Sequence, residues 1–173
     1  MKAVVLDPLP VEVERLIERR QQLGLDGHDE VWGGVYRMAP CARGRHGYLE
    51  HELAAVLRPY AQAAGLVGTG AFNLGDGADD FRVPDGGYHR DLDPETVYFS
   101  TAVVVVEILS SGHESYGKLP FYAAHGVEEV VMVHPDEHRV EVLILTGDHY
   151  QEGRGSAVPG GEASRVEAAV RCL

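Results

Sequence analysis

Apolar side chains follow one another without alternation between Thr101 and Ser110. Four consecutive valines are followed by Glu107 and then by two more aliphatic residues. A continuous β-branched run of this kind is typical of a central strand that is buried on both faces. Because a carboxylate is costly to desolvate, Glu107 then needs a partner, which is a cation, a metal or a proton.

Apolar residues at helical spacing predict three helices. The long one, from Arg45 to Ala64, has one apolar face and contains Pro59, which we expect to kink it or to end its regular part. That face consists of Leu49, Leu53, Val56, Leu57 and Tyr60. A helix from Leu9 to Gln22 precedes it, and a short helix from Lys118 to His125 ends at Gly126.

Two β-hairpins are predicted from short apolar runs around turn residues. The first covers residues 30–38 and turns at Gly33 and Gly34, a pair that tolerates positive φ. The second covers residues 128–145 and turns at Pro135 and the two acidic residues after it. Each hairpin supplies two antiparallel strands to the expected fold.

The rest of the chain predicts two further strands and a polar tail. The strands are expected at residues 66–74 and 81–88, the second interrupted by a proline, with a loop at 75–80 between them. Residues 146–161 are rich in glycine and are expected to be a loop. Residues 162–172 are expected to form a final helix or an added strand.

Length and composition indicate one soluble domain. The 173 residues suffice for one core and show no repeat and no linker, so we expect a single domain of the α/β (α+β) class over residues 1–173. No apolar run reaches the roughly 18 residues of a membrane span, and the N-terminus is too short for a secretory signal. Cys41 and Cys172 form no spacing pattern. We expect a cytoplasmic protein with reduced thiols.

The charged residues restrict the expected partners. A formal net charge of -12 argues against broad non-specific binding to DNA or RNA, although it leaves room for a local basic cleft. Basic residues are almost all arginine, and the only lysines are Lys2 and Lys118. Lys118 therefore marks a position where an arginine does not serve.

Three residues form the candidate catalytic constellation. Asp85 follows Pro84 at the end of one predicted strand, Glu107 lies in the next strand, and Lys118 opens the following helix. Two carboxylates on adjacent strands can share a divalent cation such as Mg²⁺, or Mn²⁺ in its place. Such a cation activates water and stabilises charge on a phosphate oxygen, and a nearby ammonium can orient the water or stabilise that charge. This order of acid, acid and lysine is typical of metal-dependent phosphodiester hydrolysis.

Six pieces of the chain occur in the order and at the spacing of one known family. They are Glu30 with Gly34 to Met38, His46 at the start of the long helix, Pro84-Asp85, Val106 to Ser110, Lys118 to Glu129, and the hairpin that turns at Pro135. Through these pieces the chain resembles the Uma-two family of restriction-endonuclease-like proteins, in the PD-(D/E)XK nuclease superfamily. The resemblance covers about residues 29–145.

The resemblance implies a restriction-endonuclease-like core, with a mixed central β-sheet flanked by helices and an N-terminal helix and β-hairpin. It also implies that Asp85 and Glu107 are metal ligands and that Lys118 is the catalytic lysine. The chain departs from the superfamily pattern at Leu109, where the usual lysine two residues after the acid is missing. Pro120 stands where the family commonly has arginine. This departure affects the geometry expected for the short helix.

Each candidate also has a purely structural interpretation. Glu107 could be a buried acid paired with an arginine, Asp85 a turn residue, and Lys118 a solvated helix residue. His46 and Glu50 are weaker candidates. They lie four residues apart on one helix face and could both point at the metal, but a histidine that caps the helix start is an equal alternative.

Three functions remain open at this point. The first is a Mg²⁺- or Mn²⁺-dependent endonuclease, acting on DNA rather than RNA and working as a homodimer. The second is an inactive binding module on the same fold. The acidic net charge and the missing lysine at the position of Leu109 support it. The third is a metal-dependent hydrolase of a small phosphorylated molecule. Arg37, Arg43 and Arg45 are the best candidates for a basic nucleic-acid-binding patch.

Overall fold

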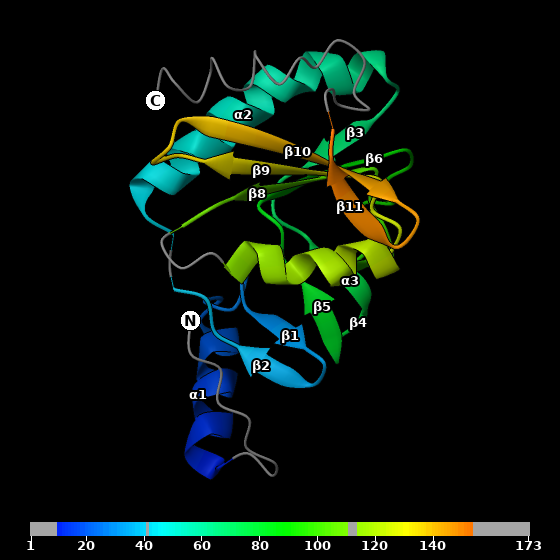
Figure 1. Cartoon of the computed structure of the whole chain (residues 1–173). Coiled ribbons are helices and arrows are strands. Elements are labelled where there is room, and N and C mark those ends of the chain that lie inside the picture. The colour runs from blue at the N-terminus through cyan, green and yellow to red at the C-terminus, as the bar shows by residue number, and fades with distance from the viewer. Residues whose placement is uncertain (1–9, 41, 111–113, 154–173) are drawn as a thin grey trace.

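The computed structural model describes residues 10–40, 42–110 and 114–153, which form two β-sheets and three α-helices (Figure 1). The larger sheet has the strand order β11-β10-β9-β8-β6-β3. Its strands are β3 (Val67–Thr69), β6 (Gly86–His89), β8 (Val104–Ile108), β9 (Glu129–His134), β10 (Arg139–Thr146) and β11 (His149–Glu152). β8 and β9 run parallel and the other neighbours are antiparallel, so the sheet is mixed, as expected.

The smaller sheet has the strand order β2-β1-β5-β4-β7. Its strands are β1 (Glu30–Trp32), β2 (Val35–Arg37), β4 (Asn73–Gly77), β5 (Asp80–Arg82) and β7 (Tyr98–Phe99). β1 and β2 are the predicted first hairpin. Gly33 and Gly34 form its turn with φ of +55° and +82°, which is the left-handed conformation that favours glycine.

Two helices cover opposite faces of the larger sheet (Figure 1). They are α2 (Gly44–Ala63) and α3 (Leu119–Ala124), and the 3-10 helix η1 (Glu114–Lys118) leads directly into α3. Val104 and Val106 of β8 pack with residues of α2, whereas Val105 packs with Tyr122 of α3. All five residues of β8 are buried, which confirms that the valine run is a central strand with no wet face.

The apolar face of α2 agrees with its prediction. Leu49, Leu53 and Leu57 are buried against the sheet, and the helix continues through Pro59 to Ala63. Although Pro59 has no backbone N–H to donate, it does not end the helix. This packing holds α2, whose first turn carries His46, on the larger sheet, whose strand β8 carries Glu107.

The structure differs from the prediction where the chain crosses between the sheets. Residues 66–74 form two strands, β3 and the start of β4, that belong to different sheets. Residues 80–89 likewise form β5 in the smaller sheet and β6 in the larger one. Pro84 stands at the second crossing, because a residue without an N–H cannot continue a ladder. The expected loop at 75–80 is mostly the β4–β5 hairpin.

The polar tail also contains a strand that the sequence did not predict. β11 pairs with β10 at the edge of the larger sheet, within the part expected to be a loop. Its residues are mostly exposed and polar, so they carry no apolar signal. The helix or strand expected at 162–172 lies outside the described residues.

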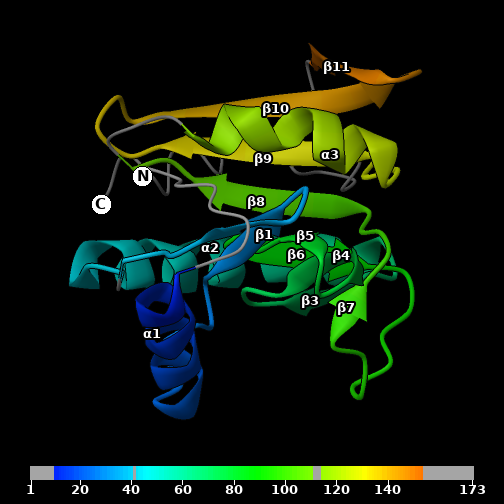
Figure 2. The ribbon, with the colours of Figure 1, turned by 90° about the horizontal axis from the view of Figure 1, so that it is seen from below.

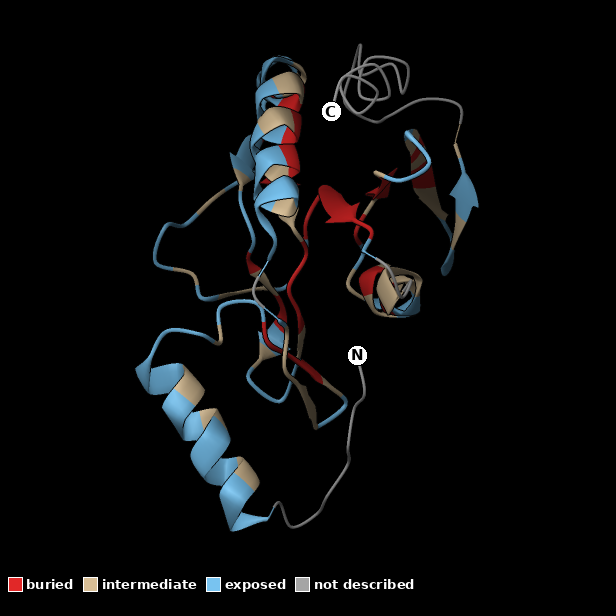
Figure 3. Ribbon diagram, turned by 90° about the vertical axis from the view of Figure 1, so that its left-hand side faces the viewer, coloured by how far each residue is buried: buried red, intermediate tan, exposed pale blue. Residues whose placement is uncertain are grey.

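Helix α1 (Val11–Gln22) stands away from both sheets (Figures 1 and 2). None of its residues is buried, whereas α2 and α3 carry buried residues on the sides that face the strands (Figure 3). Arg20 fastens it to the body of the protein, since its guanidinium donates to both carboxylate oxygens of Asp29 at 2.8 and 2.6 Å. Within the described residues, no helix combines the length and the apolar character that crossing a membrane requires.

Candidate functional site

Asp85 lies where the chain enters β6. Its N–H donates to the carbonyl of Val106 at 3.1 Å, and its Oδ2 accepts the N–H of Ile108 at 2.6 Å. The antiparallel register of β6 and β8 pairs Gly86 with Val106. One residue further along, Asp85 therefore faces Glu107. The fold thus brings the two predicted carboxylates to facing positions on adjacent strands.

Two side chains from the first turns of α2 meet Asp85. The Nε2 atom of His46 lies 3.0 Å from Oδ1 of Asp85 and 3.2 Å from Oε1 of Glu50. One ligand atom from each of the three residues lies within 4.8 Å of the other two. We call His46, Glu50 and Asp85 the histidine cluster. The helical spacing that placed His46 and Glu50 on one face is confirmed.

The histidine cluster is partly open and incompletely paired. Its side chains are 23%, 31% and 16% exposed for His46, Glu50 and Asp85. The hydrogen bond to Asp85 raises the pKa of His46, against the opposing effect of burial. Oε1 of Glu50 is buried yet has no well-formed hydrogen bond. Its contact with Nε2 of His46 is therefore electrostatic only, and a bound cation could pair with it directly.

Glu107 lies in a second group of polar side chains that is more deeply buried. Its Oε1 accepts a hydrogen bond from the ammonium of Lys118 at 2.9 Å and another from the hydroxyl of Tyr122. Lys118 also lies 2.8 Å from Oε1 of Glu30, on β1 of the other sheet. We call Glu30, Glu107, Lys118 and Tyr122 the lysine network. It joins the two sheets and α3.

Lys118 uses all three of its ammonium protons inside the protein. Its acceptors are Glu30, Glu107 and the carbonyl of Val83, the last at 3.3 Å. Burial lowers the pKa of this amine, but the two carboxylates outweigh burial and raise the pKa overall. The two carboxylates therefore favour the charged ammonium form of Lys118.

Glu107 presents its two oxygens differently. Among the described residues, both of its hydrogen bonds end on Oε1. Burial raises the pKa of Glu107 and the charge of Asp85 raises it further, while Lys118 and Tyr122 act in the opposite direction. Glu107 is not a member of the group of ligand atoms that the histidine cluster forms. The structure thus brings Asp85 together with His46 and Glu50, and Glu107 together with Lys118.

Two members of the lysine network were not among the predicted site residues. Glu30 and Tyr122 both fell within the pieces that matched the family, but no local pattern in the sequence linked them to Glu107. The only local hint was the position of Glu30, two residues before Trp32, which places both side chains on the same face of a short strand. The indole N–H of Trp32 does donate to Oε2 of Glu30, at 2.6 Å.

Arginines and aromatic rings stack beside the lysine network. Trp32 lies between the guanidinium groups of Arg37 and Arg82, at 3.7 and 4.5 Å from the ring centroid, and Arg82 also lies over Phe121. Of the predicted basic patch, Arg37 is thus held against the site, whereas Arg45 pairs with Asp136 at 3.0 Å. The guanidinium groups of Arg37 and Arg82 are therefore held by stacking on Trp32.

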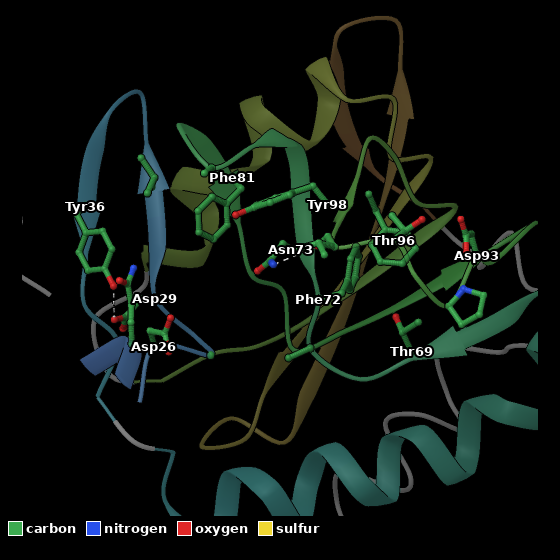
Figure 4. A pocket seen from close by; sticks show the side chains of 18 of the residues that line it. Asp26, Asp29, Tyr36, Thr69, Phe72, Asn73, Phe81, Asp93, Thr96 and Tyr98 are labelled. Carbon is green, nitrogen blue, oxygen red and sulfur yellow. Dashed lines mark hydrogen bonds between the residues drawn. The ribbon is translucent and has the colours of Figure 1, made fainter. Parts of the chain in front are cut away.

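Two hollows of the surface lie away from the histidine cluster and the lysine network. One of about 720 Å³ is lined by Asp29, Tyr36, Phe72 and Tyr98 among others, on the outer side of the smaller sheet (Figure 4). Another of about 570 Å³ is lined by His89 and Arg90 among others. Neither is lined by a residue of the histidine cluster or the lysine network. These hollows therefore give no support to the reading as a hydrolase of a small phosphorylated molecule.

The chain is similar to one family and to a solved structure. The model of the Uma-two family (Uma2), described as "Putative restriction endonuclease", matches residues 16–171. The solved structure is that of a "putative nuclease belonging to DUF820" from Anabaena variabilis ATCC 29413. It is 18% identical with a TM-score of 0.64, over 82% of this chain and 90% of that chain, which shows the fold.

No curated protein matches the chain. The family match nevertheless covers nearly the whole sequence, and the fold is shared with the solved structure. The expected restriction-endonuclease-like architecture is thereby confirmed, and family and fold together indicate a nuclease. The chain therefore belongs to the Uma-two family.

Proposed function

We propose that this protein is an endonuclease that hydrolyses phosphodiester bonds with the help of Mg²⁺ or Mn²⁺. The observation that carries the proposal is the histidine cluster, which sets Asp85 beside His46 and Glu50 and opposite Glu107 in the strand register. Family membership supplies the nuclease expectation, and the cluster supplies a place for the cation.

The residues of the cluster fit a divalent cation. The buried Oε1 of Glu50 lies 3.2 Å from Nε2 of His46 but accepts no hydrogen bond, so a cation there would supply a direct partner. Carboxylates are the ligands that Mg²⁺ and Mn²⁺ prefer, whereas imidazole favours the later transition metals. A set with both ligand types suits Mn²⁺ at least as well as Mg²⁺. We propose Asp85 and Glu107 as its principal ligands, with His46 and Glu50 beside them.

When bound, the cation would lower the pKa of a coordinated water and neutralise charge on a phosphate oxygen. The protein itself fixes the ligands. The N–H of Ile108 holds Oδ2 of Asp85, which leaves Oδ1 to face His46. Lys118 and Tyr122 hold Oε1 of Glu107, so Oε2 is the oxygen that we assign to the cation.

Lys118 acts in this proposal as a fixed positive charge. Its raised pKa keeps it protonated, so it donates hydrogen bonds and does not take a proton. The contact with the carbonyl of Val83 is the longest of its three, at 3.3 Å. That donor is the one most easily turned toward a phosphate or an attacking water.

The test is cleavage of supercoiled DNA with Mn²⁺ or Mg²⁺. Asp85→Asn keeps an oxygen for the N–H of Ile108 but removes the charge, and it is expected to lower the cleavage rate by a factor of 10² or more, on the order expected when transition-state charge stabilisation is lost. Asp91→Asn, an exposed acid outside the cluster, is the matched control. Cleavage that survives Asp85→Asn, or that continues in excess chelator, would refute the proposal.

The second candidate is a binding module on the same fold that has lost its chemistry. The ammonium of Lys118 favours it, because each of its three donors already has an acceptor within the protein. The net charge of -12 points the same way. Binding of DNA without cleavage under any divalent cation would select this candidate over the nuclease.

DNA is the proposed substrate, and two copies of the chain are the proposed active unit. Cleavage of both strands of a duplex suits a pair of copies related by a two-fold axis. Sedimentation equilibrium tests the dimer, and competition between DNA and RNA of equal length tests the substrate class.

A further inference from the structure

Glu30 reaches the candidate site from the other sheet and is fully engaged there. Its side chain is 6% exposed. Oε1 accepts the backbone N–H of Val83 at 2.7 Å and lies 2.8 Å from the ammonium of Lys118. Oε2 accepts the indole N–H of Trp32 at 2.6 Å. Charge-assisted hydrogen bonds of this kind hold the carboxylate in one orientation.

Glu30 and Lys118 together hold the segment that leads to Asp85. Glu30 binds the N–H of Val83, and Lys118 binds the carbonyl of the same residue. Val83 comes two residues before Asp85, at the point where the chain passes from the smaller sheet to the larger one. Both polar groups of this backbone unit are therefore fixed by the lysine network.

Glu30 also sets the charge that surrounds Glu107. The network contains two carboxylates and one ammonium, so with both acids ionised its net charge is -1. Without the charge of Glu30, Lys118 and Glu107 would form a neutral pair. A neutral pair attracts a divalent cation less than a group with excess negative charge does.

We propose that Glu30 is a positioning residue of the candidate metal site. It draws Lys118 partly away from Glu107, so that Glu107 keeps negative charge for a cation, and it fixes the backbone ahead of Asp85. This inference rests on the metal site of the proposed function. It adds a residue from the smaller sheet to a site otherwise built on the larger sheet and its helices.

The first experiment is calorimetric titration of Mn²⁺ into the full-length protein and its Glu30→Gln variant. Glutamine keeps the size of the side chain and removes its charge. We expect Mn²⁺ to bind about tenfold more weakly, as for other residues that orient metal ligands without touching the metal.

Two variants serve as matched controls. Glu30→Gln also weakens the bond from Trp32. Trp32→Phe removes that bond without changing the residues of the contact between Glu30 and Lys118, and it keeps a smaller aromatic ring beside Arg37 and Arg82. Glu114→Gln removes a carboxylate that lies 3.7 Å from Arg37, beside the same stack. Both controls are expected to bind Mn²⁺ within about twofold of the wild type if the effect belongs to the contact between Glu30 and Lys118.

A spectroscopic measurement reports on Lys118 without metal or activity. The chain has two lysines, so a sample labelled with ¹⁵N at lysine Nζ and carrying Lys2→Arg gives one lysine signal. In this background we expect slow exchange of the Lys118 ammonium protons with water, and at least severalfold faster exchange in Glu30→Gln, since one of three acceptors is weakened.

The outcomes separate this inference from the proposed function. Weaker Mn²⁺ binding and faster proton exchange in Glu30→Gln, with both controls unchanged, support it. Wild-type affinity in Glu30→Gln overturns the inference and leaves the metal site intact. A loss of folding stability with unchanged Mn²⁺ affinity overturns it as well, because Glu30 would then be structural only. A wild-type protein that binds no Mn²⁺ overturns the metal site and this inference together.

Discussion

The histidine cluster and the lysine network lie around facing strand positions but differ in how completely they are paired. In the lysine network the charged side chains are between 3% and 10% exposed, and every proton of the ammonium has an acceptor. In the histidine cluster the side chains are between 16% and 31% exposed, and one buried oxygen accepts no hydrogen bond. The difference indicates a division of roles: the closed group fixes the geometry, and the open group can admit a ligand.

The largest expected effect comes from removing the ammonium of Lys118 from the lysine network. Lys118→Met leaves the carboxylates of Glu30 and Glu107 buried without a counter-charge. We expect the free energy of unfolding to fall by about 3–5 kcal/mol, as when one partner of a buried ion pair is removed. Urea denaturation followed by circular dichroism measures it. Arg45→Met breaks an exposed pair and is expected to cost less than about 1 kcal/mol. Equal losses of stability in the two variants would contradict the claim that the lysine network is buried and fully paired.

A smaller effect is expected from Tyr122→Phe. This change deletes the hydroxyl that donates to Glu107 and leaves the ring in the core. The free energy of unfolding should fall by about 1.5–3 kcal/mol, since the lost hydrogen bond is to a charged group. Tyr48→Phe is the control, because Tyr48 is 53% exposed. A stability within error of the wild type would mean that the hydroxyl is not needed to satisfy Glu107.

Substitutions in the histidine cluster should change the affinity for Mn²⁺ more than the free energy of unfolding. His46→Asn removes an imidazole from the histidine cluster, and we expect Mn²⁺ to bind about tenfold more weakly, or about 1.4 kcal/mol. His51→Asn, an exposed histidine on the same helix, should leave binding unchanged. Unaltered Mn²⁺ affinity in His46→Asn would place the cation, if it binds, away from this cluster.

The smallest expected effect is a pH dependence of the metal-free protein. Because Asp85 raises the pKa of His46 above its ordinary value of 6.5, the charged imidazole stabilises the fold. That stabilisation is complete below pH 6.5 and is lost as the pH rises through the raised pKa. The difference in melting temperature between wild type and His46→Gln should therefore shrink between about pH 6 and pH 9. A difference that grows with pH would mean that the neutral imidazole is the stabilising form.

Much of the larger sheet could be predicted because its strands have a strong local signature. The valine run became β8, and the hairpin across Pro135 became β9 and β10. Both patterns depend only on burial of the residues themselves. The division into two sheets was missed, because it depends on pairings between distant segments, such as Val31 with Phe81. No run of neighbouring residues records such a pairing.

The same reasoning explains which site residues were found. Glu107 stood out as an acid inside an apolar strand, and Asp85 and Lys118 as charged residues at a strand end and a helix start. The fold brings each of the three into one of the two groups. Whether they bind a cation stays a prediction. Glu30 was overlooked because an acid in a short hairpin is unremarkable until the other sheet packs against it. Its importance comes from tertiary contact, which the family resemblance pointed to without explaining.

The enclosure of Lys118 has a practical consequence. Reagents that acylate amines react only with an uncharged, accessible nitrogen, and this one is 10% exposed and bound on all three sides. Acylation of Lys118 would therefore occur only after the contact between the two sheets had opened. The chain has a single other lysine, so the modified site is easily assigned. The rate at which Lys118 is acylated, measured by mass spectrometry, would therefore report how often the two sheets separate, without any engineered label.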